Sequence, residues 1–123
     1  MTILIVEDED ILSSVLQEKF EEKNFKVILA KDGSVVLPLV KKNRPDAILL
    51  DILLPKVNGM EVLSQLKADE DLRNIPVIVM SNLGEDSKIK EALQLGAVDY
   101  MVKTQHPINE LIEKVKEYIL KAK

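Results

Sequence analysis

Short apolar runs alternate along this chain with longer segments in which apolar residues recur every three or four positions. Three runs, Ile3–Val6, Ala47–Leu50 and Val77–Met80, are apolar throughout and too short to be helices. Continuous apolar runs of this length are typical of strands that are buried on both faces of a parallel sheet. Lys26–Ala30 and Tyr100–Val102 are two weaker strand candidates. The pattern therefore predicts five strands.

In the segments between these runs, apolar residues recur at the three- and four-residue spacing of a helix. This spacing predicts helices that include residues 11–20, 63–66, 89–93 and 108–120. Asn58 and Glu61 have the spacing of a capping box before the second of these helices, and Gly96 is placed to end the third. Residues 34–42 are also helix-like but contain Pro38, which removes a backbone donor and clashes one turn back. We expect that helix to be short, kinked or late-starting.

Length and composition exclude several classes of protein. The 123 residues have the length of one domain, so we expect residues 1–123 to form a single domain. A net charge of -4 argues against a nucleic-acid-binding surface, and the absence of cysteine excludes disulfides and thiolate metal sites. No apolar run approaches the roughly 20 residues that a membrane span needs, and the N-terminus lacks a signal-peptide pattern. We therefore expect a cytoplasmic protein that does not enter membranes.

Alternating strands and helices predict an α/β domain with a parallel sheet. Ligands of such sheets bind beyond the carboxyl ends of the strands, so the residues that follow each strand are informative. These residues are Glu7, Asp8, Asp51, Ser81 and Lys103. Three carboxylates that converge on one crevice favour a hard divalent cation, and Mg²⁺ is the best candidate.

Several sequence motifs carry a resemblance to a known family. They are the acidic pair Glu7–Asp8, the segment LLDILLPKVNG around Asp51, the segment VIVMSNL that contains Ser81, and the segment GAVDYMVK that ends at Lys103. In this order they resemble the receiver domain of two-component response regulators, over essentially the whole chain. The resemblance implies a flavodoxin-like, doubly wound sheet of five parallel strands in the order 2-1-3-4-5.

The resemblance also implies a phosphorylation switch with a role for each matching residue. Asp51 would accept the phosphoryl group, and Mg²⁺ would be held by Glu7, Asp8, Asp51 and the backbone carbonyl of Leu53. Ser81 and Lys103 would contact the phosphoryl oxygens, while Ser81 and Tyr100 would form the switch. The donor would be a sensor histidine kinase or a phosphotransfer protein. The downstream target would be a protein, with no direct binding of nucleic acid by this domain. Whether the domain stands alone or belongs to a larger regulator stays open.

The chemistry of these residues agrees with that assignment. A carboxylate can attack a phosphoryl group and form an acyl phosphate. Crowded carboxylates would repel an anionic donor, and Mg²⁺ together with Lys103 would offset that repulsion. Leu53 and Leu83 are expected to border the path of an attacking water, and because both are apolar we expect slow loss of the phosphoryl group. Thr104 replaces the proline that usually follows the family's lysine, so we expect a trans peptide bond and a rearranged loop there.

Three other interpretations fit parts of the sequence. A receiver-like interaction module that works without phosphorylation would share the fold, and labelling with a phosphodonor would separate the two. Asp8 and Asp10 have the Asp-x-Asp spacing of a haloacid dehalogenase-type phosphatase, which turnover of a small substrate would reveal. A flavodoxin would share the topology, but it would be coloured by its flavin and would need a phosphate loop where this chain has acids.

Overall fold

The computed structural model describes residues 1–82, 84–103 and 106–122. Its strands form one parallel sheet, as the sequence pattern predicted, and their order is β2-β1-β3-β4-β5, as the family resemblance implied. They are β1 (Thr2–Val6), β2 (Lys26–Ala30), β3 (Ala47–Leu50), β4 (Val77–Ser81) and β5 (Asp99–Val102). Each strand lies within one residue of its predicted bounds. The longer β4 is the difference that concerns the site, because it brings Ser81 into the sheet.

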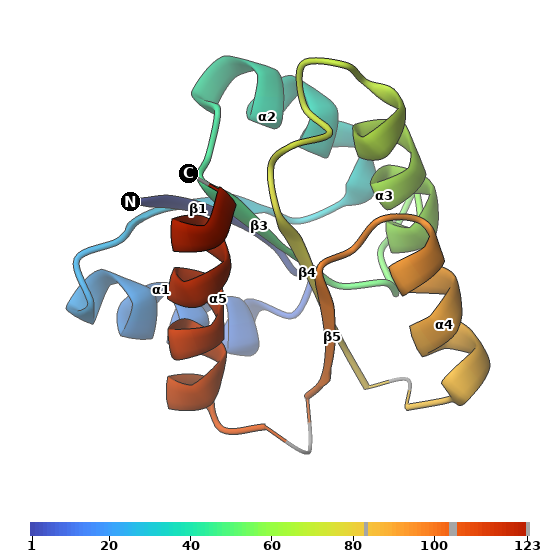
Figure 1. Ribbon diagram of the computed structural model, residues 1–123. Helices are drawn as coiled ribbons and strands as arrows, with labels where there is room; N and C mark the ends of the chain where they lie inside the picture. Colours follow the sequence, from blue (N-terminus) through green and yellow to red (C-terminus); the bar gives the residue numbers. More distant parts are fainter. Residues whose placement is uncertain (83, 104–105, 123) are drawn as a thin grey trace.

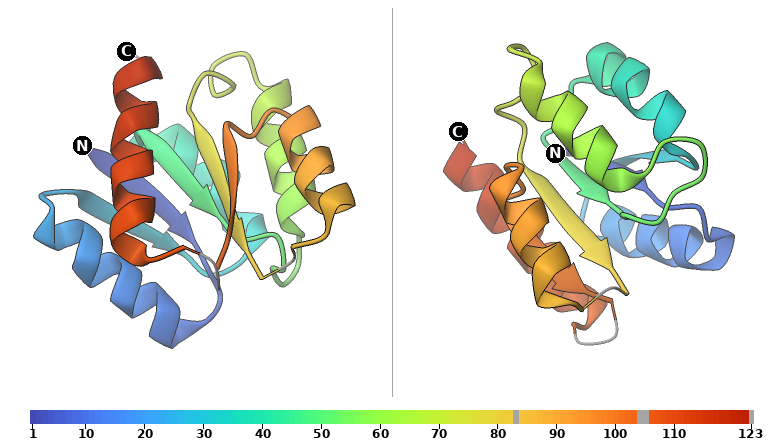
Figure 2. Two further views of the ribbon diagram at one scale, coloured as in Figure 1. Left: turned by 60° about the horizontal axis from the view of Figure 1, so that its bottom comes forward. Right: turned by 90° about the vertical axis from the view of Figure 1, so that its right-hand side faces the viewer.

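Helices cover both faces of the sheet (Figures 1 and 2). Helices α1 (Asp10–Glu22) and α5 (Ile108–Ala122) lie on one face, to the left in Figure 1. The opposite face carries the short 3-10 helix η1 (Gly33–Val35) and the helices α2 (Val36–Asn43), α3 (Gly59–Ala68) and α4 (Asp86–Gln94). Among the described residues, no helix combines the length and the apolar character that crossing a bilayer requires.

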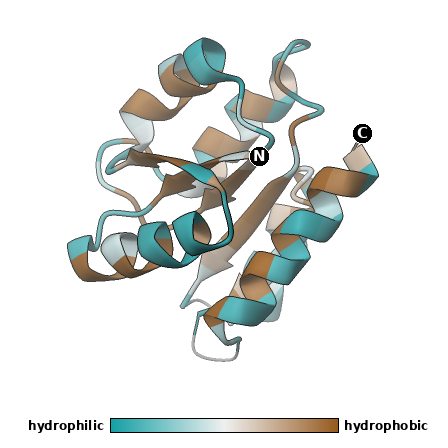
Figure 3. Cartoon of the chain, turned by 90° about the vertical axis from the view of Figure 1, so that its left-hand side faces the viewer, coloured by the Kyte–Doolittle hydropathy of each residue, from teal (hydrophilic) through white to brown (hydrophobic). Residues whose placement is uncertain are grey.

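Alternate residues of each strand feed two separate cores. In β1, Ile3 and Ile5 pack with residues of α1 and α5, whereas Leu4 and Val6 pack with residues of α2, α3 and α4. This division follows from the period of two along a strand. The strands are therefore apolar on both faces, and the helices turn their polar residues outward (Figure 3).

The ends of the helices follow the predicted signals. The Asn58 side chain accepts a hydrogen bond from the Glu61 N–H at 3.0 Å and so caps α3. Gly96 has φ +111° and follows α4, where the N–H groups of Gly96 and Ala97 donate to the carbonyls of Leu93 and Ala92. Helix α2 begins at Val36, so Pro38 occupies its first turn, where a missing N–H costs no intrahelical bond. The expectation of a short, late-starting helix is confirmed.

The register of the sheet brings the strand ends to one edge. Val6 pairs with Leu50, Leu50 pairs with Val79, and Ser81 pairs with Val102. The residues that follow β1, β3 and β5 consequently emerge next to one another. The loop after β3 is packed closely at Gly59, where an added Cβ would lie 2.3 Å from the Asp51 carbonyl oxygen. Only glycine allows this approach of α3 to the residue that follows β3.

Candidate functional site

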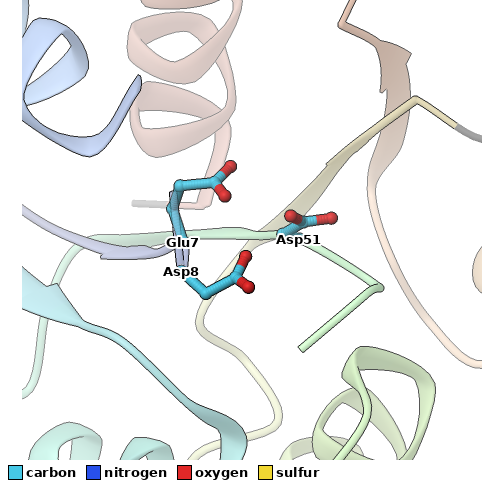
Figure 4. Close-up of side chains that lie close together, drawn as sticks. All are labelled: Glu7, Asp8 and Asp51. Atoms are coloured by element: carbon cyan, nitrogen blue, oxygen red, sulfur yellow. The ribbon is translucent and has the colours of Figure 1, made fainter. Parts of the chain in front are cut away.

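Three carboxylates meet at the carboxyl edge of the sheet. Glu7 and Asp8 follow β1, Asp51 follows β3, and one oxygen from each lies within 4.8 Å of the others. Figure 4 shows the three side chains extending into one shared space. Glu7 and Asp51 are only 1% and 5% exposed, whereas Asp8 is exposed. Buried carboxylates are costly unless they are paired, so this cluster requires a positive partner.

Lys103 supplies that positive partner from the end of β5. Its ammonium lies 2.7 Å from Glu7 Oε1 and 3.1 Å from Asp51 Oδ2, and it donates a hydrogen bond to each. The lysine side chain is itself only 10% exposed, so these ion pairs are shielded from water. One cation is therefore shared between two buried anions, and Asp8 adds a third negative charge at the rim.

Backbone N–H groups fix the orientation of the two buried acids. The Leu53 N–H donates to Asp51 Oδ1 at 3.2 Å, and the Glu9 N–H donates to Glu7 Oε2 at 3.1 Å. Each acid thus has one oxygen on the lysine and the other on the backbone. Such contacts hold both carboxylates in place before any ligand arrives.

The surroundings shift the pKa of Asp51 and of Lys103. Burial raises the pKa of Asp51 to about 6, the charge of Glu7 adds to the rise, and Lys103 and the Leu53 N–H oppose it. Burial alone would lower the pKa of Lys103, but its hydrogen bonds and charge interactions with Glu7 and Asp51 raise it above the ordinary value. Lys103 is therefore fully charged at neutral pH, while Asp51 is a carboxylate held in an unfavourable place. An added cation would lower the electrostatic cost of this buried negative charge.

A cavity of about 150 Å³ opens above these groups, and we call it the acidic cavity. It is lined by Asp8, Glu9, Asp51, Leu53, Asn82 and Lys103. At roughly 30 Å³ per water molecule, it has room for a phosphoryl group and a few waters. The sequence prediction included four of the lining residues and missed Glu9 and Asn82. The apolar run that predicts this strand ends at Met80, so the sequence pointed to Ser81, the next residue, and not to Asn82.

Ser81 and Tyr100 lie beside one another on the paired strands β4 and β5. Ser81 is fully buried at the end of β4, and Tyr100 in β5 is 8% exposed. Burial raises the pKa of the Tyr100 hydroxyl, the charges of Asp51 and Glu85 add to the rise, and a hydrogen bond with Ser81 opposes it. The predicted switch pair is therefore in contact, and the negative charge of Asp51 is one of the causes that raise the pKa of Tyr100. Ser81 is not one of the described residues that line the acidic cavity.

The donor set fits Mg²⁺. Oxygen ligands at about 2.1 Å lie at most about 4.2 Å apart across the ion, close to the 4.8 Å span of the three carboxylates. A small inward movement, or a bridging water, would complete the fit for Glu7, Asp8 and Asp51. For Leu53 the structure shows an N–H contact to Asp51; its carbonyl as a fourth ligand stays a prediction.

The remaining sequence predictions concern Asp10, Leu83 and Thr104. Asp10, the second acid of the Asp-x-Asp spacing, pairs with Lys31 at 2.6 Å and is exposed at the start of α1. It lies outside the lining of the acidic cavity, so the structure does not assemble the acid pair of a phosphatase. Leu83 and Thr104, on which the predictions about water access and the peptide bond rest, lie outside the described residues.

Comparisons with known proteins agree with this geometry. The family model of the response regulator receiver domain matches residues 3–116. Sporulation initiation phosphotransferase F of Bacillus subtilis is 36% identical over 95% of this chain and 92% of its own length. The Francisella response regulator 1452 receiver domain superposes with a TM-score of 0.91 at 30% identity, covering 99% of this chain and 98% of that one. The receiver domain of the Pseudomonas aeruginosa sensor histidine kinase PA1611, solved with Mg²⁺ in its active-site cleft, gives a TM-score of 0.87 at 28% identity, with 96% of each chain covered.

Proposed function

The chain belongs to the response regulator receiver domain family, whose members act as phosphorylation-dependent switches, and we propose that Asp51 is its phosphoryl acceptor. One observation carries the proposal: Asp51 lies buried at the base of the acidic cavity, with the ammonium of Lys103 3.1 Å from its Oδ2. We further propose that residues 1–123 act as one receiver domain, which catalyses only its own phosphorylation and dephosphorylation. Its place of action would be the cytoplasm, as is typical of receivers.

The transfer step uses the carboxylate of Asp51 as the nucleophile. An oxygen of Asp51 attacks the phosphorus of the donor, the bond from phosphorus to the donor breaks, and the donor group keeps the electron pair. For a histidine kinase or a phosphotransfer protein the donor group is an imidazole. Lys103 can follow the charge from the carboxylate to the phosphoryl oxygens, because its ammonium already lies against Asp51. Ser81 would donate its hydroxyl hydrogen to one of these oxygens.

A divalent cation completes the proposed site. Glu7, Asp8, Asp51 and the Leu53 carbonyl would hold Mg²⁺, partly through water, as the PA1611 receiver holds Mg²⁺ in its own cleft. When bound, the ion neutralises the acids and draws the phosphoryl oxygens toward them. The resting contacts of Lys103 with Glu7 and Asp51 partly satisfy the same oxygens, so metal binding competes with them. We therefore expect weak Mg²⁺ affinity.

Phosphorylation would change the surface formed by α4, β5 and α5, which we propose as the binding face for a downstream protein. The route begins at Ser81, whose hydroxyl would turn toward the phosphoryl group and release Tyr100 from its present contact. Tyr100 belongs to β5 and packs in the core on the side of α4. Amide hydrogen exchange with a stable phosphoryl mimic tests this step. Changes confined to Glu7, Asp8 and Asp51 would contradict it.

Labelling with a small acyl phosphate tests the proposed function directly. Wild type should take up phosphoryl groups with Mg²⁺ and fail to do so when Mg²⁺ is removed. Asp51→Asn and Asp8→Ala should not label, whereas Asp71→Asn, which changes an exposed acid remote from the cavity, should label as wild type does. A folded wild-type protein that takes up no label with Mg²⁺ would support the alternative, an interaction module that works without phosphorylation. Labelling of Asp8→Ala at the wild-type rate would refute the metal site.

A further inference from the structure

Asn82 is the one uncharged polar residue among the described residues that line the acidic cavity. The other lining residues are three acids, one lysine and one leucine. Asn82 follows β4 directly and is exposed, whereas Asp51 lies 5% exposed at the base of the cavity. It therefore belongs to the rim, facing the solvent side of the acceptor.

Loss of a phosphoryl group from Asp51 requires a water at that solvent side. The water oxygen attacks phosphorus, the bond from phosphorus to the Asp51 oxygen breaks, and the electron pair returns to the carboxylate. Both hydrogens of the water leave with the product, dihydrogen phosphate. Attack in line with the breaking bond places the water opposite Asp51, which is the mouth of the cavity.

The lining residues differ in their ability to hold such a water. Leu53 is 58% exposed at the mouth and offers no hydrogen-bonding group. Asp8 and Glu9 are exposed acceptors, but their negative charge opposes the phosphoryl oxygens, and Asp8 faces the metal position. An amide can accept a hydrogen from the water with its oxygen and donate to a phosphoryl oxygen with its nitrogen. Asn82 offers both groups without adding charge.

We propose that the side-chain amide of Asn82 holds the molecule that lies across the phosphorus atom from Asp51. During loss that molecule is the attacking water, which Asn82 orients toward phosphorus. The inference rests on the proposed function of Asp51 and adds a residue that sets the lifetime of the phosphorylated state. In this arrangement Leu53 screens the phosphoryl group, and Asn82 admits one ordered water beside it.

The rate of phosphoryl loss from purified, labelled protein tests the role of Asn82. The protein is labelled with radioactive acetyl phosphate and Mg²⁺, the donor is removed, and the decay is followed. Loss of one water-orienting hydrogen bond should slow the decay of Asn82→Ala about five-fold, which corresponds to about 1 kcal/mol. Asn82→Gln, which keeps the amide, should recover most of the wild-type rate. Asn74→Ala is the matched control, because it changes an exposed asparagine that precedes β4 at the opposite edge of the sheet.

The outcomes separate this inference from the function on which it rests. Slow decay in Asn82→Ala, with recovery in Asn82→Gln and an unchanged rate in Asn74→Ala, supports the role of the amide. If Asn82→Ala decays as fast as wild type, the role of the amide is overturned, while Asp51 remains the acceptor. The role of the amide is also overturned if Asn82→Gln decays as slowly as Asn82→Ala. A wild-type protein that takes up no label overturns the proposed function and this inference together. Calorimetric titration with Mg²⁺ should give the same affinity for wild type and Asn82→Ala, because the amide is not a proposed ligand.

Discussion

Replacing Asp51 by asparagine should make the protein more stable at pH 7 when Mg²⁺ is absent. The wild-type carboxylate is 5% exposed, faces Glu7 and is charged at this pH, although its pKa is raised to about 6. The asparagine side chain of the Asp51→Asn variant would have nearly the same shape without the charge. The substitution thus removes an electrostatic cost while keeping the packing.

The size of the effect follows from the pKa shift. A rise from 3.8 to about 6 means that the folded state disfavours the charged form by about 3 kcal/mol relative to the unfolded state. Asparagine has one amide oxygen, so it can accept from the Leu53 N–H or from Lys103 but not fully from both. Loss of one such hydrogen bond lowers the free energy of unfolding by about 1 kcal/mol. A net gain of about 2 kcal/mol should result, or a rise in Tm on the order of 8 °C.

The pH dependence has a definite sign. Because the folded-state pKa of Asp51 is raised, protonation favours the folded state, and the cost of the charge is present in full above pH 6. The cost diminishes as the pH falls through about 6 toward 3.8. The stability difference between Asp51→Asn and wild type should therefore shrink over this interval.

Urea unfolding followed by circular dichroism measures this difference directly. The measurement is made with a chelator at pH 7 and at pH 4.5, and again with Mg²⁺ at pH 7, where binding to wild type should narrow the gap. Glu113→Gln, which changes an exposed acid on α5, is the control and should stay within about 0.5 kcal/mol of wild type. Equal or lower stability of Asp51→Asn at pH 7 without Mg²⁺ would refute the reasoning, as would a gap that grows toward pH 4.5.

Three further substitutions test other parts of the structure. Gly59→Ala would place a Cβ 2.3 Å from the Asp51 carbonyl oxygen, so it should lower the free energy of unfolding in urea by on the order of 2 kcal/mol and slow phosphoryl uptake. Unchanged uptake would contradict the close packing of this loop. Ser13→Ala removes a buried hydroxyl that has no hydrogen-bond partner among the described residues, so thermal unfolding should show a gain of up to about 1 kcal/mol, and a clear loss would reveal a hidden partner. Leu53→Asn should speed phosphoryl loss, while Leu120→Asn, at an exposed leucine on α5, should not; equal decay rates would argue against screening by Leu53.

The fold was predictable because several levels of the sequence agree. Apolar runs such as Ile3–Val6 are buried on both faces of a parallel sheet and differ in period from the helices between them. The signals at Asn58 and Gly96 act over a few residues, so they were visible without tertiary information. The late start of α2 followed from the fixed geometry of Pro38.

The site was predictable only as far as strand ends determine it. The rule that ligands bind beyond the carboxyl ends of strands located Glu7, Asp51 and Lys103, which the structure brings into contact. That Lys103 bridges both acids depends on side-chain conformations, which sequence spacing does not fix. Asn82 was missed because a residue on a loop is placed by the path of the chain after the strand, and an exposed asparagine there is common.

Chemical identification of the modified residue tests the central claim most directly. The protein is treated with a phosphodonor and Mg²⁺, reduced with borohydride, which converts an acyl phosphate to an alcohol, and mapped by mass spectrometry of its peptides. Homoserine at position 51, formed only in samples that received both phosphodonor and Mg²⁺, is the predicted result. Homoserine at position 8, or a reduced aspartate at any position other than 51, would contradict the assignment of Asp51 as the phosphoryl acceptor.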